Sequence, residues 1–261
     1  MVAPPDLEIP LHAFAPGREL VAVMATSRSV ESLGELLRRL EGLGVEVHGA
    51  MISARPEGVA MIGILDVTEL GRDRGIGAIL SMSQEGVSVE IVGRGSRGFA
   101  ALGGRVLRVG GARAVVATER ILKGLFEGAR ELVGEEAGST LLYYIGLLSG
   151  EEWGRFLRNL LGDPHAAVTT FADIVASEGY ATSVVVLEGE GRYRIEVRDL
   201  VECSLLSRYA AERGGRMRTA HWSRGLIAGF LSGLEGGRWD VDEVACVNEG
   251  YDRCVFEARR R

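Results

Sequence analysis

The chain has 261 residues, 46% of them hydrophobic, and a formal net charge of -6 at pH 7. This length favours two domains of ordinary size over one large core. The 36 acidic and 30 basic residues are interspersed, so we expect no basic face of the kind that binds nucleic acid.

The first ten residues hold prolines and acids where a signal peptide needs a basic end and an apolar core. No apolar run approaches the roughly 18 residues of a membrane span. We therefore expect a cytoplasmic protein without a membrane span. Cys203, Cys246 and Cys254 are too few and too odd in number for a secreted disulfide framework. Side-chain amides are scarce, a bias typical of thermophiles.

The first part of the chain predicts the order strand, helix, strand, strand, helix, strand. Ser29 is the expected N-cap of the first helix, whose apolar residues recur at helical spacing. The expected elements are strand 19–25, helix 30–41, strands 45–53 and 58–67, helix 76–83 and strand 87–92. Such a βαββαβ unit forms a four-stranded antiparallel sheet with both helices on one face.

Residues 17–95, with this layout, resemble the ACT-type regulatory domains, which are ferredoxin-like modules that bind amino acids or similar metabolites. The resemblance implies a ligand beside the first strand-to-helix loop, "ATSRSVES", which supplies Thr26, Ser27, Arg28 and Ser29. Hydroxyls and free amides at a helix start suit a carboxylate. The alternative is that Ser27 and Ser29 simply cap the helix.

A glycine-rich stretch, "GRGSRGFAALGG", follows at 93–104. Gly93, Gly95 and Gly98 have the spacing of a dinucleotide-binding loop, but the helix that such a loop requires does not follow. We therefore interpret this stretch as a linker or domain-entry loop.

The second domain is expected at 96–261, with helices and antiparallel strands. Thr118 caps its first helix, and Asp163 with Pro164 opens its third. The remaining expected elements are short strands at 104–109 and 113–117, a helix at 139–161, a hairpin of 180–188 with 192–200, a helix at 220–234 and a last hairpin of 238–246 with 253–259.

Two of these helices carry glycines four residues apart. Glycine costs about 1 kcal/mol against alanine inside a helix, so each glycine face needs room. That room serves either close helix packing, within the chain or across a dimer, or a ligand. The glycines are Gly146, Gly150 and Gly154 in one helix and Gly225, Gly229 and Gly233 in the other.

The second half resembles the 4-vinyl reductase (hydrocarbon-binding) domain family. The resemblance is carried by "STLLYYIGLLSGEEWGRFL", "HWSRGLIAGFLSGLEG" and "VDEVACVNEGYDRCVFE", which ends in E-x-x-C, a seven-residue spacer and C-x-F. Relatives in this family include archaeal stand-alone proteins, bacterial phenol sensors and Golgi-tethering subunits. The resemblance implies helices packed on an antiparallel sheet, an α+β chain overall, and a homodimer.

In the phenol sensors of this family a glutamate and three cysteines bind zinc. Glu243, Cys246 and Cys254 match the last three ligands, whereas Ala220 stands at the first. His221, the next residue, is the candidate for the missing ligand because zinc accepts imidazole as readily as thiolate.

A turn centred on Gly250 would place Cys246 and Cys254 opposite each other across the last hairpin. Glu243 would then point to the other face unless a bulge turns it inward. Bound zinc, a reduced apolar pair and a disulfide remain open, and Cys203 lies on a nearby segment.

Candidates for an apolar ligand pocket come from the helices, although such residues are also ordinary core residues. They are Tyr143, Tyr144, Trp153, Phe171, Trp222, Gly225 and Gly229. No motif for a nicotinamide, flavin or iron–sulfur cofactor is present, so we predict no enzymatic activity.

These observations predict a non-enzymatic sensor of a small apolar molecule. The sequence shows no helix-turn-helix, so we expect the sensor to act through a protein partner. The alternatives are an assembly scaffold, as in the tethering complexes, and an enzyme of tetrapyrrole reduction.

Overall fold

The computed structural model describes residues 9–56, 58–83, 86–103, 107–189 and 191–261. It divides at Val115 and Val116 into two compact units. In the described residues, no helix has the length and apolar character needed to cross a membrane. The predicted α+β fold class is confirmed, with antiparallel sheets in both units.

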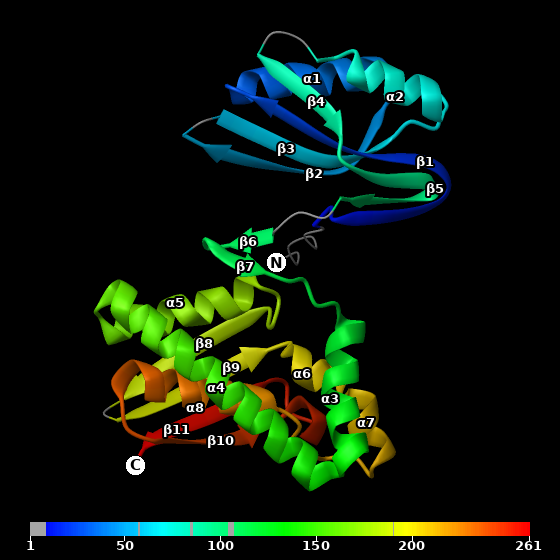
Figure 1. The fold of residues 1–261 in the computed structure, drawn as a ribbon. Helices are drawn as coiled ribbons and strands as arrows, with labels where there is room; N and C mark the ends of the chain where they lie inside the picture. Colours follow the sequence, from blue (N-terminus) through cyan, green and yellow to red (C-terminus); the bar gives the residue numbers. More distant parts are fainter. Residues whose placement is uncertain (1–8, 57, 84–85, 104–106, 190) are drawn as a thin grey trace. The chain divides into compact units, whose positions relative to one another are not determined.

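The first unit is a ferredoxin-like βαββαβ module (Figure 1). Its antiparallel sheet has the strand order β2-β3-β1-β4, and α1 and α2 cover one face. The elements are β1 (His12–Ser27), α1 (Val30–Gly42), β2 (Glu46–Arg55), β3 (Gly58–Asp66), α2 (Arg72–Leu80) and β4 (Val87–Ile91).

The start of α1 follows the predicted cap. The Ser29 side chain accepts a hydrogen bond from the Ser32 amide, 3.2 Å away, which satisfies one free donor of the first turn. Leu33, Leu36 and Leu40 lie one helical turn apart and are buried against the sheet. The helix therefore begins where its cap allows and turns its apolar stripe to the core.

The linker predicted at 93–104 is wrong for residues 93–102. These residues form β5 (Gly93–Leu102), which pairs antiparallel with the first half of β1. A Cβ atom on Gly93 would lie 1.8 Å from the Ala101 carbonyl oxygen, and one on Gly95 2.2 Å from the Leu20 oxygen. The glycines thus allow the backbone of β5 to approach neighbouring backbone closely, which their spacing alone does not reveal.

Of the predicted strand at 104–109, residues 104–106 lie outside the described residues. The remainder is β6 (Leu107–Val109), paired with β7 (Ala112–Ala114).

The second unit packs helices on an antiparallel sheet with the strand order β10-β11-β9-β8 (Figure 1). Helices α5 and α8 pack on the sheet, and α4 packs on α8. The elements are α3 (Glu119–Val133), α4 (Glu135–Leu161), α5 (Pro164–Ser177), β8 (Ser183–Gly189), β9 (Arg192–Arg198), α6 (Val201–Leu205), α7 (Ser207–Glu212), α8 (His221–Glu235), β10 (Trp239–Ala245), a 3-10 turn (Val247–Glu249) and β11 (Cys254–Arg260).

The two glycine rows meet each other. Helices α4 and α8 run in the same direction, and a Cβ atom on Gly146 would lie 2.1 Å from the Trp222 carbonyl oxygen. A Cβ atom on Gly229 would lie 1.9 Å from the Leu147 oxygen. The helices therefore touch backbone to backbone, which is the close-packing alternative within the chain, and no room for a ligand remains between them.

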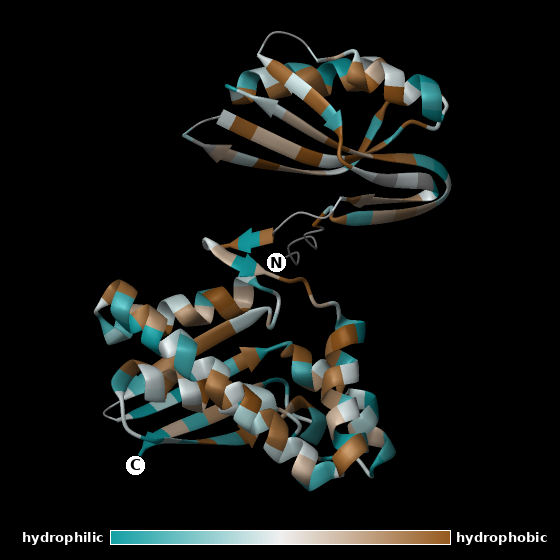
Figure 2. Ribbon diagram, in the orientation of Figure 1, coloured by the Kyte–Doolittle hydropathy of each residue, from teal (hydrophilic) through white to brown (hydrophobic). Residues whose placement is uncertain are grey.

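On the face of α4 opposite the glycines, six apolar side chains are exposed, and Figure 2 shows hydrophobic residues interspersed with polar ones along this helix. We call this face the outer face of α4. It consists of Leu141, Tyr144, Ile145, Leu148, Phe156 and Leu160, which are 36–65% exposed.

Candidate functional site

Four buried side chains converge at the edge of the second unit's sheet. Cys203 comes from α6, Glu243 from β10, Cys246 from the residue after β10, and Cys254 from the start of β11. Their ligand atoms all lie within 4.8 Å of one another. The Cys203 Sγ is 3.3 Å from the Cys254 Sγ and 3.6 Å from the Cys246 Sγ. We call this group the thiol cluster.

Strand register explains how these residues meet. The β10–β11 ladder ends at the pair Ala245 and Val255, so Cys246 and Cys254 stand opposite each other one step beyond it, as the turn around Gly250 predicts. The register shifts between Glu243 and Ala245. This irregularity is the bulge that was needed to turn the carboxylate inward.

Neighbouring polar groups hold the thiol cluster in place. The Ala220 amide donates to Glu243 Oε2 over 3.2 Å. The Thr219 hydroxyl donates to the Cys203 Sγ over 3.4 Å. The Asn248 side-chain amide donates to the Cys203 carbonyl oxygen and to the Thr219 hydroxyl, at 3.0 and 2.9 Å.

Burial and crowding shift the acidity of the cluster. Burial, and then the neighbouring Cys246, raise the pKa of Glu243 to about 9. Hydrogen bonds from Cys203 and then Cys254 favour the thiolate of Cys246 and lower its pKa. The same bond with Cys246, followed by that with Cys254, raises the pKa of Cys203. Without a cation, these shifts favour negative charge on the Cys246 thiolate over the Glu243 carboxylate.

The donor set fits a soft divalent metal. Among the described residues, the buried carboxylate of Glu243 contacts the Ala220 amide and the Cys203 thiol, and neither of these carries a positive charge. The buried cluster thus has no positive group among these contacts to balance its negative charge, and zinc supplies a positive charge with matching ligand preferences. A zinc ion bound by all four would be held by Cys203, Glu243, Cys246 and Cys254.

His221 is not part of this cluster. Its side chain lines a surface groove with Tyr143, Tyr144 and Arg224. Burial, and then the charge of Arg130, lower the pKa of His221 to about 4. The imidazole is therefore neutral near pH 7, but it is placed away from the thiols.

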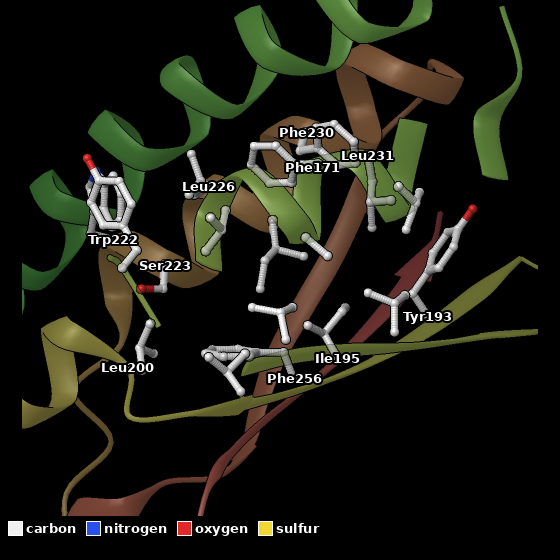
Figure 3. A pocket seen from close by; sticks show the side chains of 18 residues that line it. Phe171, Tyr193, Ile195, Leu200, Trp222, Ser223, Leu226, Phe230, Leu231 and Phe256 are labelled. Atoms are coloured by element: carbon white, nitrogen blue, oxygen red, sulfur yellow. The ribbon is translucent and has the colours of Figure 1, made fainter. Parts of the chain in front are cut away.

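A second feature, the apolar cavity, lies between helices α5 and α8 and the sheet (Figure 3). The cavity has a volume of about 70 Å³. Leu226, Phe230 and Phe171 lie on the helix side, and Ile195 and Phe256 lie on the sheet side. The other lining residues are Val168, Ala172, Val175, Tyr180, Val184, Val186, Tyr193, Val197, Leu200, Trp222, Ser223, Ile227 and Leu231.

The cavity includes two of the seven predicted pocket residues, Phe171 and Trp222. Trp153 packs against Phe171 from outside, with ring centroids 6.2 Å apart. Tyr143 and Tyr144 line the surface groove beside His221. The remaining two, Gly225 and Gly229, contact the backbone of α4 and have no side chain toward the cavity.

Similarity to known proteins agrees with this geometry. A family model of the vinyl-4-reductase domain matches residues 214–260, which include α8, β10 and β11. The phenol-responsive sensory domain of the transcription activator PoxR, solved with phenol, matches with a TM-score of 0.51 and 17% identity. The match covers 62% of this chain and 81% of that domain, and it shows a shared fold.

The C-terminal part of the chain contains a vinyl-4-reductase domain. Two more distant structures also match. A vinyl-4-reductase family protein from Methanocaldococcus jannaschii has a TM-score of 0.40 and 18% identity, with 57% of this chain and 84% of that chain covered. A trafficking protein particle complex subunit 3 from Naegleria fowleri, covalently bound to palmitic acid, has a TM-score of 0.36 and 15% identity, with 55% and 95% covered. No curated protein sequence matches the chain.

The second unit also contains a buried charged network that the sequence did not predict. Glu202 is fully buried and accepts hydrogen bonds from the Trp222 and Ser223 amides, at 3.0 and 2.9 Å, and from the Ser223 hydroxyl at 2.8 Å. It thereby caps the first turn of α8. The buried Arg130 lies 3.9 Å away and donates to the Thr219 carbonyl oxygen.

The missed residues carried a weak signal. Glu202 and Cys203 lie in "RDLVECSLL", and helices α6 and α7, formed from residues 201–212, were not predicted. An acid next to a cysteine in an apolar run is a candidate for burial, but no local sequence pattern identifies its hydrogen-bond partners at 219–223.

In the first unit, the predicted ligand loop lies at the end of β1 and the start of α1. The Ser27 hydroxyl accepts from the Ser29 amide over 3.3 Å, and Ser29 caps the helix. Thr26 pairs with both β3 and β4 within the sheet, and Arg28 is exposed. Ser27 and Ser29 thus make the hydrogen bonds expected if they cap the helix, which was the alternative to ligand binding.

Proposed function

We propose that the vinyl-4-reductase domain binds a small, predominantly apolar molecule in the apolar cavity, and that the chain is a non-enzymatic sensing protein. The observation that carries the proposal is the wall of the cavity, which is built almost wholly from aliphatic and aromatic side chains. Such walls favour apolar guests, because burying an apolar surface stabilises by about 25 cal/mol per Å².

Two polar groups of the cavity wall already have partners. The Ser223 hydroxyl donates to Glu202, and the Tyr193 hydroxyl donates to Glu235. A guest with several polar groups would lose its hydration without compensation. Toluene therefore suits the cavity better than a polyol or a sugar of similar size.

Titration calorimetry with toluene tests the proposal. Val186 on β8 lines the cavity, whereas its neighbour Val185 points outward and is 49% exposed. Val186→Phe fills the cavity, so we expect at least about tenfold weaker toluene binding, equal to about 1.4 kcal/mol. Val185→Phe is the matched control and should bind as the wild type does. Equal binding by the two variants, or no binding by the wild type, contradicts the proposal.

We further propose that the thiol cluster binds one zinc ion. Elemental analysis of protein purified without chelator should give about one zinc per chain. Cys203→Ser should lower zinc affinity by more than the 10–100-fold typical of losing a supporting residue. His221→Gln should leave zinc affinity unchanged, because His221 lies outside the cluster. If His221→Gln lowers zinc affinity and Cys203→Ser does not, the ligand is His221 and not Cys203.

Self-association through the outer face of α4 is part of the same proposal. The helix has Glu136 in its first turn and Arg158 in its last, so two copies packed antiparallel bring unlike charges together. Leu148, near the middle and 65% exposed, would lie close to the twofold axis.

Light scattering after gel filtration measures this association. Leu148→Glu should convert a dimer to a monomer, while Leu187→Glu, at a position on β8 that is 53% exposed, should not. A wild-type monomer, or a dimer unaffected by Leu148→Glu, refutes the α4 interface.

Two other functions predict different results. An assembly scaffold would co-purify with another polypeptide and bind no toluene. An enzyme of tetrapyrrole reduction would need a redox cofactor with visible absorbance. The sensing proposal requires instead that a bound small molecule changes association with a protein partner.

A further inference from the structure

The thiol cluster and the apolar cavity share two short segments of backbone. In the segment around α6, Leu200 lines the cavity and Cys203 belongs to the cluster. In the segment leading into α8, Thr219 bonds to the cluster while Trp222 and Ser223 line the cavity. Each segment therefore connects the two features within three or four residues.

Hydrogen bonds tie the second segment to the cluster. The Ala220 amide bonds to the carboxylate of Glu243, and the Thr219 hydroxyl bonds to the sulfur of Cys203. Asn248 bonds to both Thr219 and the Cys203 backbone. The positions of residues 219 and 220 therefore depend on where the cluster's sulfur and oxygen atoms lie.

The neighbour of Cys203 completes the connection. Glu202 accepts the amides of Trp222 and Ser223 and the Ser223 hydroxyl, all at 2.8–3.0 Å. Because Glu202 and Cys203 are adjacent, a movement of α6 shifts the cap of α8 and the cluster together. Figure 3 shows Leu200, Trp222 and Ser223 together at one end of the cavity.

We propose that occupancy of the thiol cluster by zinc and occupancy of the apolar cavity by an apolar molecule are positively coupled through α6 and the first turn of α8. This inference rests on the proposed function. A zinc ion held by Cys203 and Glu243 fixes the two atoms to which Thr219 and Ala220 bond. That ordering leaves less freedom to be lost when a guest packs against Trp222, so the guest binds more tightly.

Coupling of this kind is reciprocal: each ligand raises the affinity of the other by the same factor. Couplings between sites in one protein are commonly about 5- to 150-fold, and we expect at least about fivefold here. Toluene affinity is measured by calorimetry with zinc-loaded and chelator-treated full-length protein. Zinc affinity is measured by competition with a chromophoric chelator, with and without saturating toluene.

A variant series identifies the route. Thr219 is neither a proposed zinc ligand nor a lining residue, and its hydroxyl bridges Cys203 and Asn248. Thr219→Val should still bind both ligands, but with a coupling factor below about twofold. Thr219→Ser keeps the hydroxyl and should retain the coupling. Thr140→Val, at an exposed position on α4, is the matched control and should behave as the wild type.

The outcomes separate the two proposals. If toluene and zinc both bind but neither changes the other's affinity, the coupling is refuted and the proposed function stands. If toluene binds neither form, or zinc does not bind, the proposed function fails at that site and the coupling falls with it. If circular dichroism shows that chelator unfolds the second unit, zinc stabilises the whole fold and does not act only on the end of the cavity. That result also overturns the inference. Equal coupling in Thr219→Val and Thr219→Ser refutes the route through the hydroxyl.

Discussion

The two units differ most in what they bury. Among the described residues, the buried polar side chains of the first unit are Ser27 and Asp66. Those of the second are Arg130, Ser139, Glu202, Thr219, Ser223 and Glu243, in addition to three buried thiols. Buried polar groups are costly unless they are paired. The first unit is thus held mainly by apolar packing, whereas the second also depends on a network of paired buried polar groups.

The largest expected contrast comes from glycines. Gly229→Ala places a Cβ atom 1.9 Å from the Leu147 oxygen, which forces α4 and α8 apart. We expect a loss of about 3 kcal/mol or more in the free energy of unfolding. Gly34→Ala in α1 meets nothing within 4 Å, so it should gain about 0.5–1 kcal/mol.

Chemical denaturation followed by two signals measures this contrast. All three tryptophans, Trp153, Trp222 and Trp239, lie in the second unit, so their fluorescence reports on that unit. Far-ultraviolet circular dichroism reports on both units. A stable Gly229→Ala variant would contradict the backbone contact between the helices.

Replacement of buried carboxylates should give the next largest contrast. Glu202→Gln puts an amide NH2 group among three donors and removes one of the two carboxylates, Glu202 and Glu135, that pair with the buried Arg130, so we expect a loss of about 3 kcal/mol. Asp66→Asn keeps the acceptor for the Thr68 amide and hydroxyl and should cost about 1 kcal/mol. Equal losses in the free energy of unfolding would show that replacing Glu202 in the second unit destabilises no more than replacing Asp66 in the first.

The pH dependence of stability sharpens the comparison further. The pKa of His221 is lowered to about 4, first by burial and then by Arg130, so the folded state disfavours the imidazolium. This contribution is fully present above about pH 6.5 and is lost as the pH falls through 4. Because the side chain is half-buried, we expect a loss of about 2 kcal/mol in the second unit. Tryptophan fluorescence of His221→Gln should show a shallower dependence between pH 6.5 and 4, and an unchanged slope refutes this assignment.

Helix caps should give the smallest effects. Ser29→Ala removes the acceptor for the Ser32 amide in the first unit, and Asp163→Ala removes that for the Ala166 amide in the second. We expect each to cost about 0.5–1 kcal/mol. If calorimetry shows that an amino acid binds the wild type and that Ser29→Ala abolishes binding, the loop has the ligand role implied by the ACT resemblance.

Local signals in the sequence predicted the regular elements well. The Ser29 and Asp163 caps and the helical spacing of Leu33, Leu36 and Leu40 appear as expected. The bulge near Glu243 followed from the period-two rule of strands. These features depend on residues a few positions apart, which a sequence displays directly.

The rest depends on distant residues. Cys203 joins Cys246 and Cys254 across more than 40 positions, and no local pattern connects them. The stretch at 93–104 was interpreted as a linker or domain-entry loop because it is rich in glycine and no helix follows it, whereas in residues 93–102 close backbone approach in β5 requires the glycines. The cavity's walls come from α5, α8 and the sheet together, and of the predicted pocket residues only Phe171 and Trp222 line it.

The glycine contact between α4 and α8 also restricts how the second unit can move. Three carbonyl oxygens of each helix lie where the side chain of a glycine position in the other helix would begin, so the two backbones interlock. A small slide would drive oxygens into neighbouring side chains, and the next matching register lies one full turn, about 5.4 Å, away. Gradual sliding of α8 along α4 is therefore blocked. If α8 moves when a molecule binds, the movement must begin by rearranging the turn at Trp222, or else shift the whole helix by one full turn.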